Sequence, residues 1–219
     1  MKAKSVLNKY QIKILDRVAK DIFLTDEFYF TGGTALSELY LQHRESDDLD
    51  FFSLKSFDPQ SIFSRLTQWS DEFNYKILYE FIDPTHIYFL TFGDGFRLKI
   101  DFAPYPYNQL DEPKLFINKM KADSLRDIAA NKMIVLSQRR EIKDFVDLYF
   151  ILLENNFWSI REDAEKKFKV EIDPYLFAGD CMNILDFTYL PKMIKPLNLD
   201  KLKEFYKNLA RNLGKDTIE

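Results

Sequence analysis

Apolar positions in the first half of the chain follow two different spacings. Val6, Tyr10, Ile14, Val18 and Ile22 recur every four residues, which predicts an amphipathic helix over residues 5–23. Other segments are short and strand-like, and apolar and polar residues alternate over 48–51 and 96–102 as they do in half-buried strands. We expect strands over residues 28–31, 48–52, 75–82, 86–92 and 96–103, a helix over 34–42, and another that starts at Asp58-Pro59.

From Asp123 onward the spacing of apolar residues is helical. It predicts helices over residues 123–138, 140–154, 158–169, 174–187 and 199–213. The fold class is therefore α+β, with a mixed-sheet core followed by a helical C-terminal half. A Pro- and Tyr-rich stretch over residues 104–122 separates the two, and we expect an α/β domain over 1–110 and a helical domain over 111–219.

Composition and charge narrow the class of protein. The chain is 46% apolar and carries 21 Phe, which indicates a globular core. Its net charge is −4, but residues 114–143 hold eight basic and three acidic residues, a segment that either faces phosphates or forms a solvated helix face. One cysteine, no apolar signal core and no run of membrane-spanning length indicate a cytoplasmic protein without membrane association.

Three aspartates stand on the polar faces of predicted strands. Asp48 and Asp50 are two residues apart and so project to the same side, while Leu49 and Phe51 project to the other. Asp101 occupies the equivalent polar face of the strand over 96–103. Asp is disfavoured in strands, and paired carboxylates repel unless a cation lies between them. The pattern indicates either solvent-facing acids or a site for a hard divalent ion such as Mg²⁺.

Glycine is scarce, with 6 residues in 219, yet Gly32 and Gly33 are adjacent. They lie where the strand over 28–31 meets the helix over 34–42. Free backbone N–H groups at such a junction bind phosphate. A phosphate cradle beside metal-binding acids suits nucleotide transfer, in which positioning and charge stabilisation supply most of the catalysis.

These residues resemble a known pattern. Gly32-Gly33, then Asp48-Leu49-Asp50, then Asp101 is similar to the DNA polymerase β-like nucleotidyltransferase superfamily. Thr31 to Leu36 and His43 to Phe52 resemble, more narrowly, the AbiEii/AbiGii toxin family. The blocks Asp127 to Lys132 and Arg140 to Leu148 agree, except that Lys143 stands where the family usually has Arg.

The resemblance implies an enzyme, a nucleotidyltransferase that acts as the toxin of a toxin–antitoxin or abortive-infection system. It implies a nucleoside triphosphate (NTP) substrate, Mg²⁺ at a site for one or two ions, a cognate antitoxin protein, and RNA, with tRNA as one candidate, as the acceptor. It also implies site residues: Asp48, Asp50 and Asp101 for the metal, Gly32, Gly33, Thr34, Arg44, Ser46 and Lys132 for the nucleotide, and Asp48, Asp50, Asp101, Lys132 and Asp147 for catalysis.

Two other functions fit the same residues. One is a non-catalytic nucleotide-binding module, and the other is a nucleotidyltransferase that modifies a small molecule. Several residues also have structural alternatives: Ser46 as a turn cap, Arg44 as a support for the Asp-bearing strand, and Asp144 as a partner of Arg140.

Overall fold

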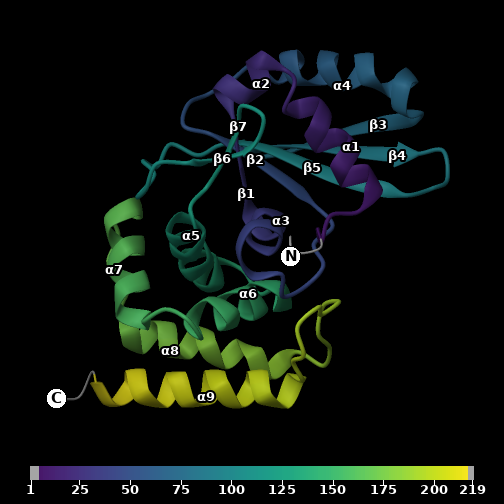
Figure 1. The fold of residues 1–219 in the computed structure, drawn as a ribbon. Helices are drawn as coiled ribbons and strands as arrows, with labels where there is room; N and C mark the ends of the chain where they lie inside the picture. Colours follow the sequence, from purple (N-terminus) through teal and green to yellow (C-terminus); the bar gives the residue numbers. More distant parts are fainter. Residues whose placement is uncertain (1–4, 217–219) are drawn as a thin grey trace. The chain divides into compact units, whose positions relative to one another are not determined.

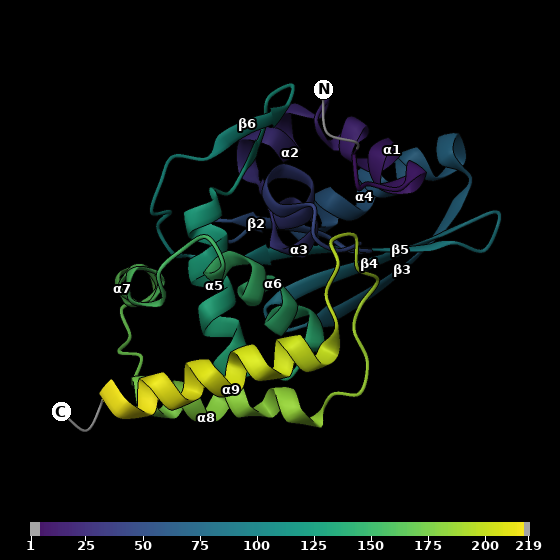
Figure 2. The same cartoon turned by 60° about the horizontal axis from the view of Figure 1, so that its bottom comes forward.

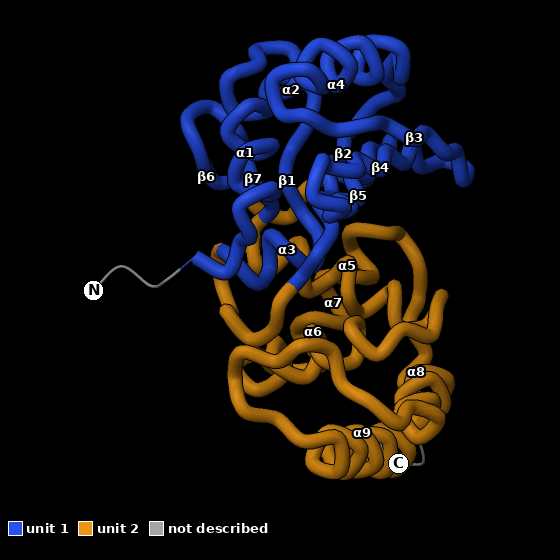
Figure 3. Tube along the Cα trace, turned by 90° about the vertical axis from the view of Figure 1, so that its right-hand side faces the viewer, with its two compact units in different colours: residues 1–38, 46–108, 112–123 blue, residues 39–45, 109–111, 124–219 orange. Residues whose placement is uncertain are grey.

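The structure is a computed structural model that describes residues 5–216 (Figure 1). The described chain divides into two compact units (Figure 3). The first comprises residues 5–38, 46–108 and 112–123, and the second comprises residues 39–45, 109–111 and 124–216. Residues 39–45 thus belong to the second unit, although the segments on both sides of them belong to the first. The predicted boundary after residue 110 places these residues in the first domain.

The first unit is built on a mixed sheet with the strand order β3-β4-β5-β2-β1-β7-β6. The pairs β2–β5 and β1–β7 are parallel and the other neighbours are antiparallel. This sheet confirms the predicted fold class. The strands are β1 (Tyr29–Thr31), β2 (Leu49–Ser53), β3 (Tyr75–Ile82), β4 (Thr85–Phe92), β5 (Arg97–Pro104), β6 (Lys114–Ile117) and β7 (Met120–Ala122).

The single helix expected over residues 5–23 is wrong, because the segment forms two helices. Asn8 caps the first through a capping box, and the helix ends at Val18. The side chain of Asp21 then accepts a hydrogen bond from the Leu24 amide and starts the second. The helical elements of the N-terminal half are α1 (Lys9–Val18), α2 (Ile22–Glu27), α3 (Gly32–Leu36), a π-helix (Ser37–Leu41) and α4 (Pro59–Phe73).

Aromatic side chains fill the core of the first unit. Phe30, Phe51 and Phe102 lie on the adjacent strands β1, β2 and β5 and are at most 1% exposed. The rings of Phe51 and Phe102 stack with centroids 5.0 Å apart. The α1 and α4 helices lie over the same side of the sheet (Figure 1). This packing fixes which side chains of β2 and β5 point away from the core.

The second unit is helical from residue 124 onward, as predicted (Figure 2). Ser124 caps its first helix by accepting a hydrogen bond from the Asp127 amide. In the described residues, no helix is long and apolar enough to cross a membrane. The elements are α5 (Leu125–Gln138), α6 (Ile142–Leu152), α7 (Phe157–Phe168), α8 (Pro174–Met182), a 3₁₀ helix (Asn183–Asp186) and α9 (Leu199–Asp216).

Candidate active site

The parallel pairing of β2 with β5 brings two of the predicted acids together. Asp50 is the register partner of Asp101, and Phe51 is the partner of Phe102. Successive residues of a strand point to opposite faces. The two aromatic rings therefore enter the core while both carboxylates project from the other face. Asp48, predicted inside the strand, lies one residue before β2 begins.

Gly32 packs directly against Asp50. It has a φ of +75°, a backbone conformation that glycine tolerates best. A β-carbon at Gly32 would lie 2.6 Å from Cγ and 2.9 Å from Cβ of Asp50, closer than non-bonded carbons approach. The adjacent Gly33 is buried in the same turn. Gly32 therefore lies in close contact with one of the predicted acids, and the binding of phosphate by the glycine pair stays a prediction.

The segment that leads into β2 is held at two points. The Thr34 hydroxyl donates a hydrogen bond to the backbone carbonyl of Asp48. The side-chain amide of Gln11 donates to the Ser46 carbonyl at 2.7 Å. These bonds fix the backbone on which Asp48 and Asp50 stand. Thr34 thus contacts a predicted metal-binding residue through its side chain, and its backbone N–H lies in the predicted cradle.

Lys99 joins the aspartates, although the sequence analysis did not include it in the site. Its ammonium donates a hydrogen bond to Asp101 Oδ2 at 2.5 Å and lies 3.9 Å from Asp48 Oδ2. Burial opposes the charge, but the hydrogen bond and the charges of Asp101, Asp48 and Asp50 outweigh it and raise the pKa of Lys99. The alternation of the polar residues Arg97, Lys99 and Asp101 with apolar ones was the sequence signal that could have placed Lys99 on the same face as Asp101.

The aspartates suit a divalent cation by their chemistry. In residues 5–216, no group of three or more His, Cys, Asp or Glu side chains is gathered closely enough to hold a metal ion. Carboxylate oxygens are nevertheless the ligands that Mg²⁺ prefers, and the Lys99 ammonium already lies among these acids. A positive charge is therefore part of the arrangement, and here the lysine supplies it.

The second unit contains a separate buried cluster around Lys132 and Asp147. The Lys132 ammonium lies 2.8 Å from Asp144 Oδ1 and 2.6 Å from Asp147 Oδ2. Arg44 binds Asp147 through two hydrogen bonds, of 2.6 Å and 2.8 Å. His43 Nε2 lies 2.7 Å from the same carboxylate. Three sequence blocks that are distant along the chain therefore converge on one aspartate.

Electrostatics in this cluster favour the ionised carboxylates. Burial raises the pKa of Asp147, but the charges of Lys132 and Arg44 outweigh burial and hold it well below its ordinary value. The same balance lowers the pKa of Asp144 and raises that of Lys132. Burial lowers the pKa of His43, so its ring is neutral at pH 7.

The expected pairing of Asp144 with Arg140 is wrong. Arg139 binds Asp144 instead, through Nε at 2.8 Å, because it caps the end of α5 next to the first turn of α6. Arg140 lies 4.0 Å from Asp186. The predicted contacts of Arg44 and Lys132 with a triphosphate, and the catalytic role of Asp147, stay predictions, since within their unit these residues bind one another.

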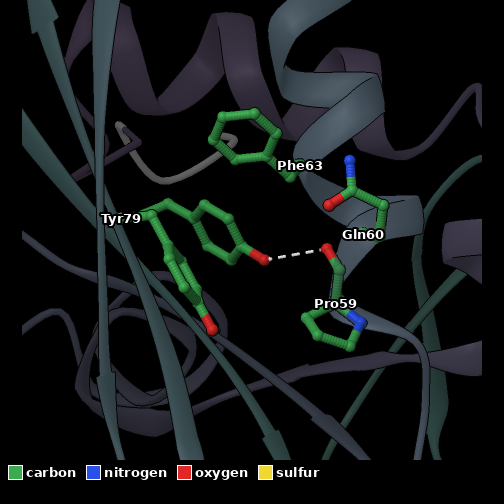
Figure 4. A pocket seen from close by; sticks show the side chains of 5 residues that line it. Pro59, Gln60, Phe63 and Tyr79 are labelled. Carbon is green, nitrogen blue, oxygen red and sulfur yellow. Dashed lines mark hydrogen bonds between the residues drawn. The ribbon is translucent and has the colours of Figure 1, made fainter.

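The first unit also contains a cavity, and Figure 4 shows the side chains that line it. It has a volume of about 260 Å³ and is lined by residues of α4, β3 and β4, with the Tyr88 hydroxyl bound to the Pro59 carbonyl. Tyr88 is the register partner of Ile100 and so shares its face of the sheet. Asp101 follows Ile100 and points to the opposite face. The cavity is therefore not part of the candidate site.

Comparison with known proteins identifies relatives of this chain. The family model described as "Nucleotidyl transferase AbiEii toxin, Type IV TA system" matches residues 13–217. An uncharacterized protein of Aquifex aeolicus (strain VF5), aq_aa25, is 35% identical over 164 residues, which cover 71% of each chain.

Solved structures share the fold at low sequence identity. A putative nucleotidyltransferase from H. pylori has a TM-score of 0.54 and 18% identity, over 97% of this chain and 99% of that one. JHP933 from Helicobacter pylori has a TM-score of 0.53 and 18% identity, over 96% of both chains. MenT4, a nucleotidyltransferase toxin from Mycobacterium tuberculosis H37Rv, has a TM-score of 0.51 and 13% identity, over 92% of this chain and 82% of that one.

The family match spans both units and includes every predicted site residue. Membership of this family implies an enzyme that transfers a nucleotide, with an NTP as its substrate. It also implies a toxin that has a cognate antitoxin. The chain belongs to the AbiEii family of nucleotidyltransferase toxins of type IV toxin–antitoxin systems.

Proposed function

We propose that this chain transfers a nucleoside monophosphate from an NTP to a hydroxyl of RNA, with tRNA as the first candidate acceptor, in a Mg²⁺-dependent reaction. The observation that supports it most is the packing of Gly32 on Asp50, with Asp101 in register beside Asp50. A glycine turn at the start of a helix, where the first backbone N–H groups have no partner within the helix, thus adjoins a pair of carboxylates, and the two together suit a triphosphate and its cation.

The chain's own residues have separate roles in this proposal. Backbone N–H groups of Gly32, Gly33 and Thr34 bind the β- and γ-phosphates, and Asp48, Asp50 and Asp101 would hold the divalent cation. When bound, that cation neutralises charge on the phosphates and polarises the reacting phosphorus. Lys99 moves from Asp101 toward the phosphates, where its charge offsets theirs.

The reaction balances with these groups. The acceptor hydroxyl oxygen forms a bond to the α-phosphorus, and the bond from that phosphorus to the bridging oxygen of the β-phosphate breaks. Pyrophosphate leaves, and Asp101 accepts the proton of the attacking hydroxyl. Catalysis then consists mainly of positioning and charge stabilisation, so the few side chains on β2 and β5 suffice.

The test is label transfer by the full chain. Purified protein is incubated with Mg²⁺, total cellular RNA and each labelled NTP in turn, and Asp50→Asn is the matched variant because it removes charge and keeps shape. We expect one NTP to label RNA with the wild type and at least a hundredfold less label with the variant. Labelling at the wild-type rate by a folded Asp50→Asn protein, or no labelled RNA with any NTP, contradicts the proposal.

Growth provides a second readout of the same variant. Induced expression of the wild type without its antitoxin is expected to arrest growth, while Asp50→Asn at equal expression is not. Thermal unfolding of both proteins checks that the variant is folded. Equal toxicity of the two would separate growth arrest from nucleotide transfer.

A further inference from the structure

The α8 and α9 helices of the second unit lie side by side and leave a groove between them (Figures 1 and 2). The groove has a volume of about 530 Å³. Gly179 and Gly214 line it, and a β-carbon on either would meet no atom within 4 Å, so the space above both is open. Tyr175, 62% exposed, stands at its edge together with Lys207 and Arg211.

A row of positive charge runs along α9 beside this groove. Lys203, Lys207, Arg211 and Lys215 follow one another every four residues and so lie on one side of the helix. Lys203 donates to the Leu185 carbonyl and Arg211 to Asn208. Among the described residues, no carboxylate pairs with any of these four side chains. We call this set the α9 cation row.

The basic segment over 114–143, which the sequence offered as a phosphate-facing surface, differs in this respect. Arg126 pairs with Asp163, Lys132 with two buried aspartates, and Arg139 with Asp144. Much of its charge is therefore neutralised within the protein. The α9 cation row, in contrast, retains charge for a partner.

The groove and the row together fit a single-stranded nucleic acid. The row is about 18 Å long, since a helix rises about 1.5 Å per residue, and a strand of several nucleotides can place its phosphates along it. Bases stack on exposed aromatic side chains, and Tyr175 offers such a ring beside the cations. An acidic polypeptide would also meet the charge, but it does not require an exposed aromatic ring at the edge.

We propose that the α8–α9 groove and the α9 cation row bind single-stranded RNA, with phosphates along the row and a base on Tyr175. The inference rests on the proposed function in one respect, that the RNA is the acceptor of the transferred nucleotide. It adds to that function a binding surface in the second unit.

Fluorescence anisotropy with a labelled, unstructured 12-nucleotide RNA tests the surface at equilibrium, without NTP or Mg²⁺. Lys207→Glu/Arg211→Glu is expected to weaken binding at least tenfold and to reduce the slope of log K against log salt by about 1.4, or about 0.7 per lost phosphate contact. Tyr175→Ala is expected to weaken binding roughly 5- to 150-fold, the effect of one stacked base, without a change in the slope.

Lys13→Glu/Lys76→Glu is the matched control, because it makes the same change in net charge at two exposed lysines of the first unit. It is expected to bind within about twofold of the wild type. Wild-type affinity of Lys207→Glu/Arg211→Glu for RNA overturns the proposal. Loss of binding to polyglutamate with unchanged RNA affinity also overturns it, because the surface would then recognise acidic protein.

The experiment separates this inference from the proposed function. Asp50→Asn, which removes transfer in that proposal, is expected to bind RNA as the wild type does. RNA labelling that persists in Lys207→Glu/Arg211→Glu at the wild-type rate would refute the surface and leave the transferase activity standing. RNA binding through the row without any labelling would refute the transferase proposal alone.

Discussion

A β-carbon on Gly32 would come within 2.6 Å of Cγ and 2.9 Å of Cβ of Asp50. The two residues belong to different elements, since Gly32 begins α3 and Asp50 lies in β2. Because of this contact, the position of the glycine turn and the position of the Asp50 side chain depend on each other. A side chain at position 32 must displace the Asp50 carboxylate or move the turn.

Gly32→Ala is therefore expected to reduce both activity and stability. The φ of +75° costs an L-residue about 1–2 kcal/mol, and overpacking against Asp50 adds about 1–3 kcal/mol. We expect label transfer to fall at least about a hundredfold because the carboxylate is displaced. Urea unfolding and the transfer assay measure the two effects.

Gly95→Ala is the control for backbone strain. Gly95 has a φ of +85°, but a β-carbon there would meet nothing within 4 Å. This variant should lose only the 1–2 kcal/mol of strain and keep its transfer activity. Equal effects of the two substitutions on activity would show that contact with Asp50 does not matter.

Lys99→Met tests whether the lysine competes with a divalent cation for the aspartates. The Lys99 ammonium lies 2.5 Å from Asp101 and 3.9 Å from Asp48, and like charges in one site repel. Calorimetric titration without nucleotide should show Mg²⁺ binding to the variant at least fivefold more tightly. Arg97→Met is the control, because it removes the same charge from the same strand two residues away. Unchanged or weaker Mg²⁺ binding by Lys99→Met contradicts the prediction.

Sequence patterns predicted the elements that have strong local signals. The alternation over residues 96–103 located β5 and its polar face, and Asp58-Pro59 marked the start of α4. Asp21 was read as a polar position within one helix, although it is the cap of a second one. The strands β6 and β7 were missed, since they are four and three residues long and follow a Pro- and Tyr-rich stretch.

The site was predicted less completely than the fold. The positions of Asp50 and Asp101 followed from periodicity, but their register is a tertiary fact that no local pattern carries. Lys99 shares the polar face of β5 with its partner Asp101, but it was not assigned to the site, because its approach to Asp48 depends on how the β2 segment lies beside β5. The preference of Asp144 for Arg139 over Arg140 depends likewise on how α5 ends.

Asp147→Asn tests the structural role of the buried cluster. The variant leaves Lys132 and Arg44 with one negative charge fewer in a site where Asp147 is fully buried. Breaking a buried ion pair by removing one partner costs about 3–5 kcal/mol, and we expect a loss of that size in denaturant unfolding. Asp16→Asn is the control, since Asp16 and Lys20 form an exposed pair worth at most about 1 kcal/mol. A loss below 1 kcal/mol for Asp147→Asn would contradict this role.

The burial of His43 leads us to expect that the stability of the protein depends on pH. The ionised Asp147 carboxylate can only accept, so His43 Nε2 donates to it, and the buried Nδ1 has no hydrogen-bond partner among the described residues. Protonation would bury an unsatisfied N–H close to Arg44 and Lys132. Burial lowers the pKa of His43 below its ordinary 6.5; the hydrogen bond and charge of Asp147 oppose this shift, and the charges of Arg44 and Lys132 add to it.

The unfolded chain therefore binds a proton at His43 at a higher pH than the folded protein does. The contribution of neutral His43 to the free energy of unfolding is fully present above pH 6.5. It falls as the pH drops toward the pKa of the folded protein, by at most about 1.4 kcal/mol per pH unit for one group.

Burial also lowers the pKa of His86, the other histidine of the chain. Urea unfolding at pH 7.5, 6.5 and 5.5 should show this decline in the wild type and in His86→Gln, and a much smaller one in His43→Gln. The buried carboxylates do not contribute in this window, because their lowered pKa values confine their effect to pH below about 4. An equally steep decline in His43→Gln would show that another group is responsible.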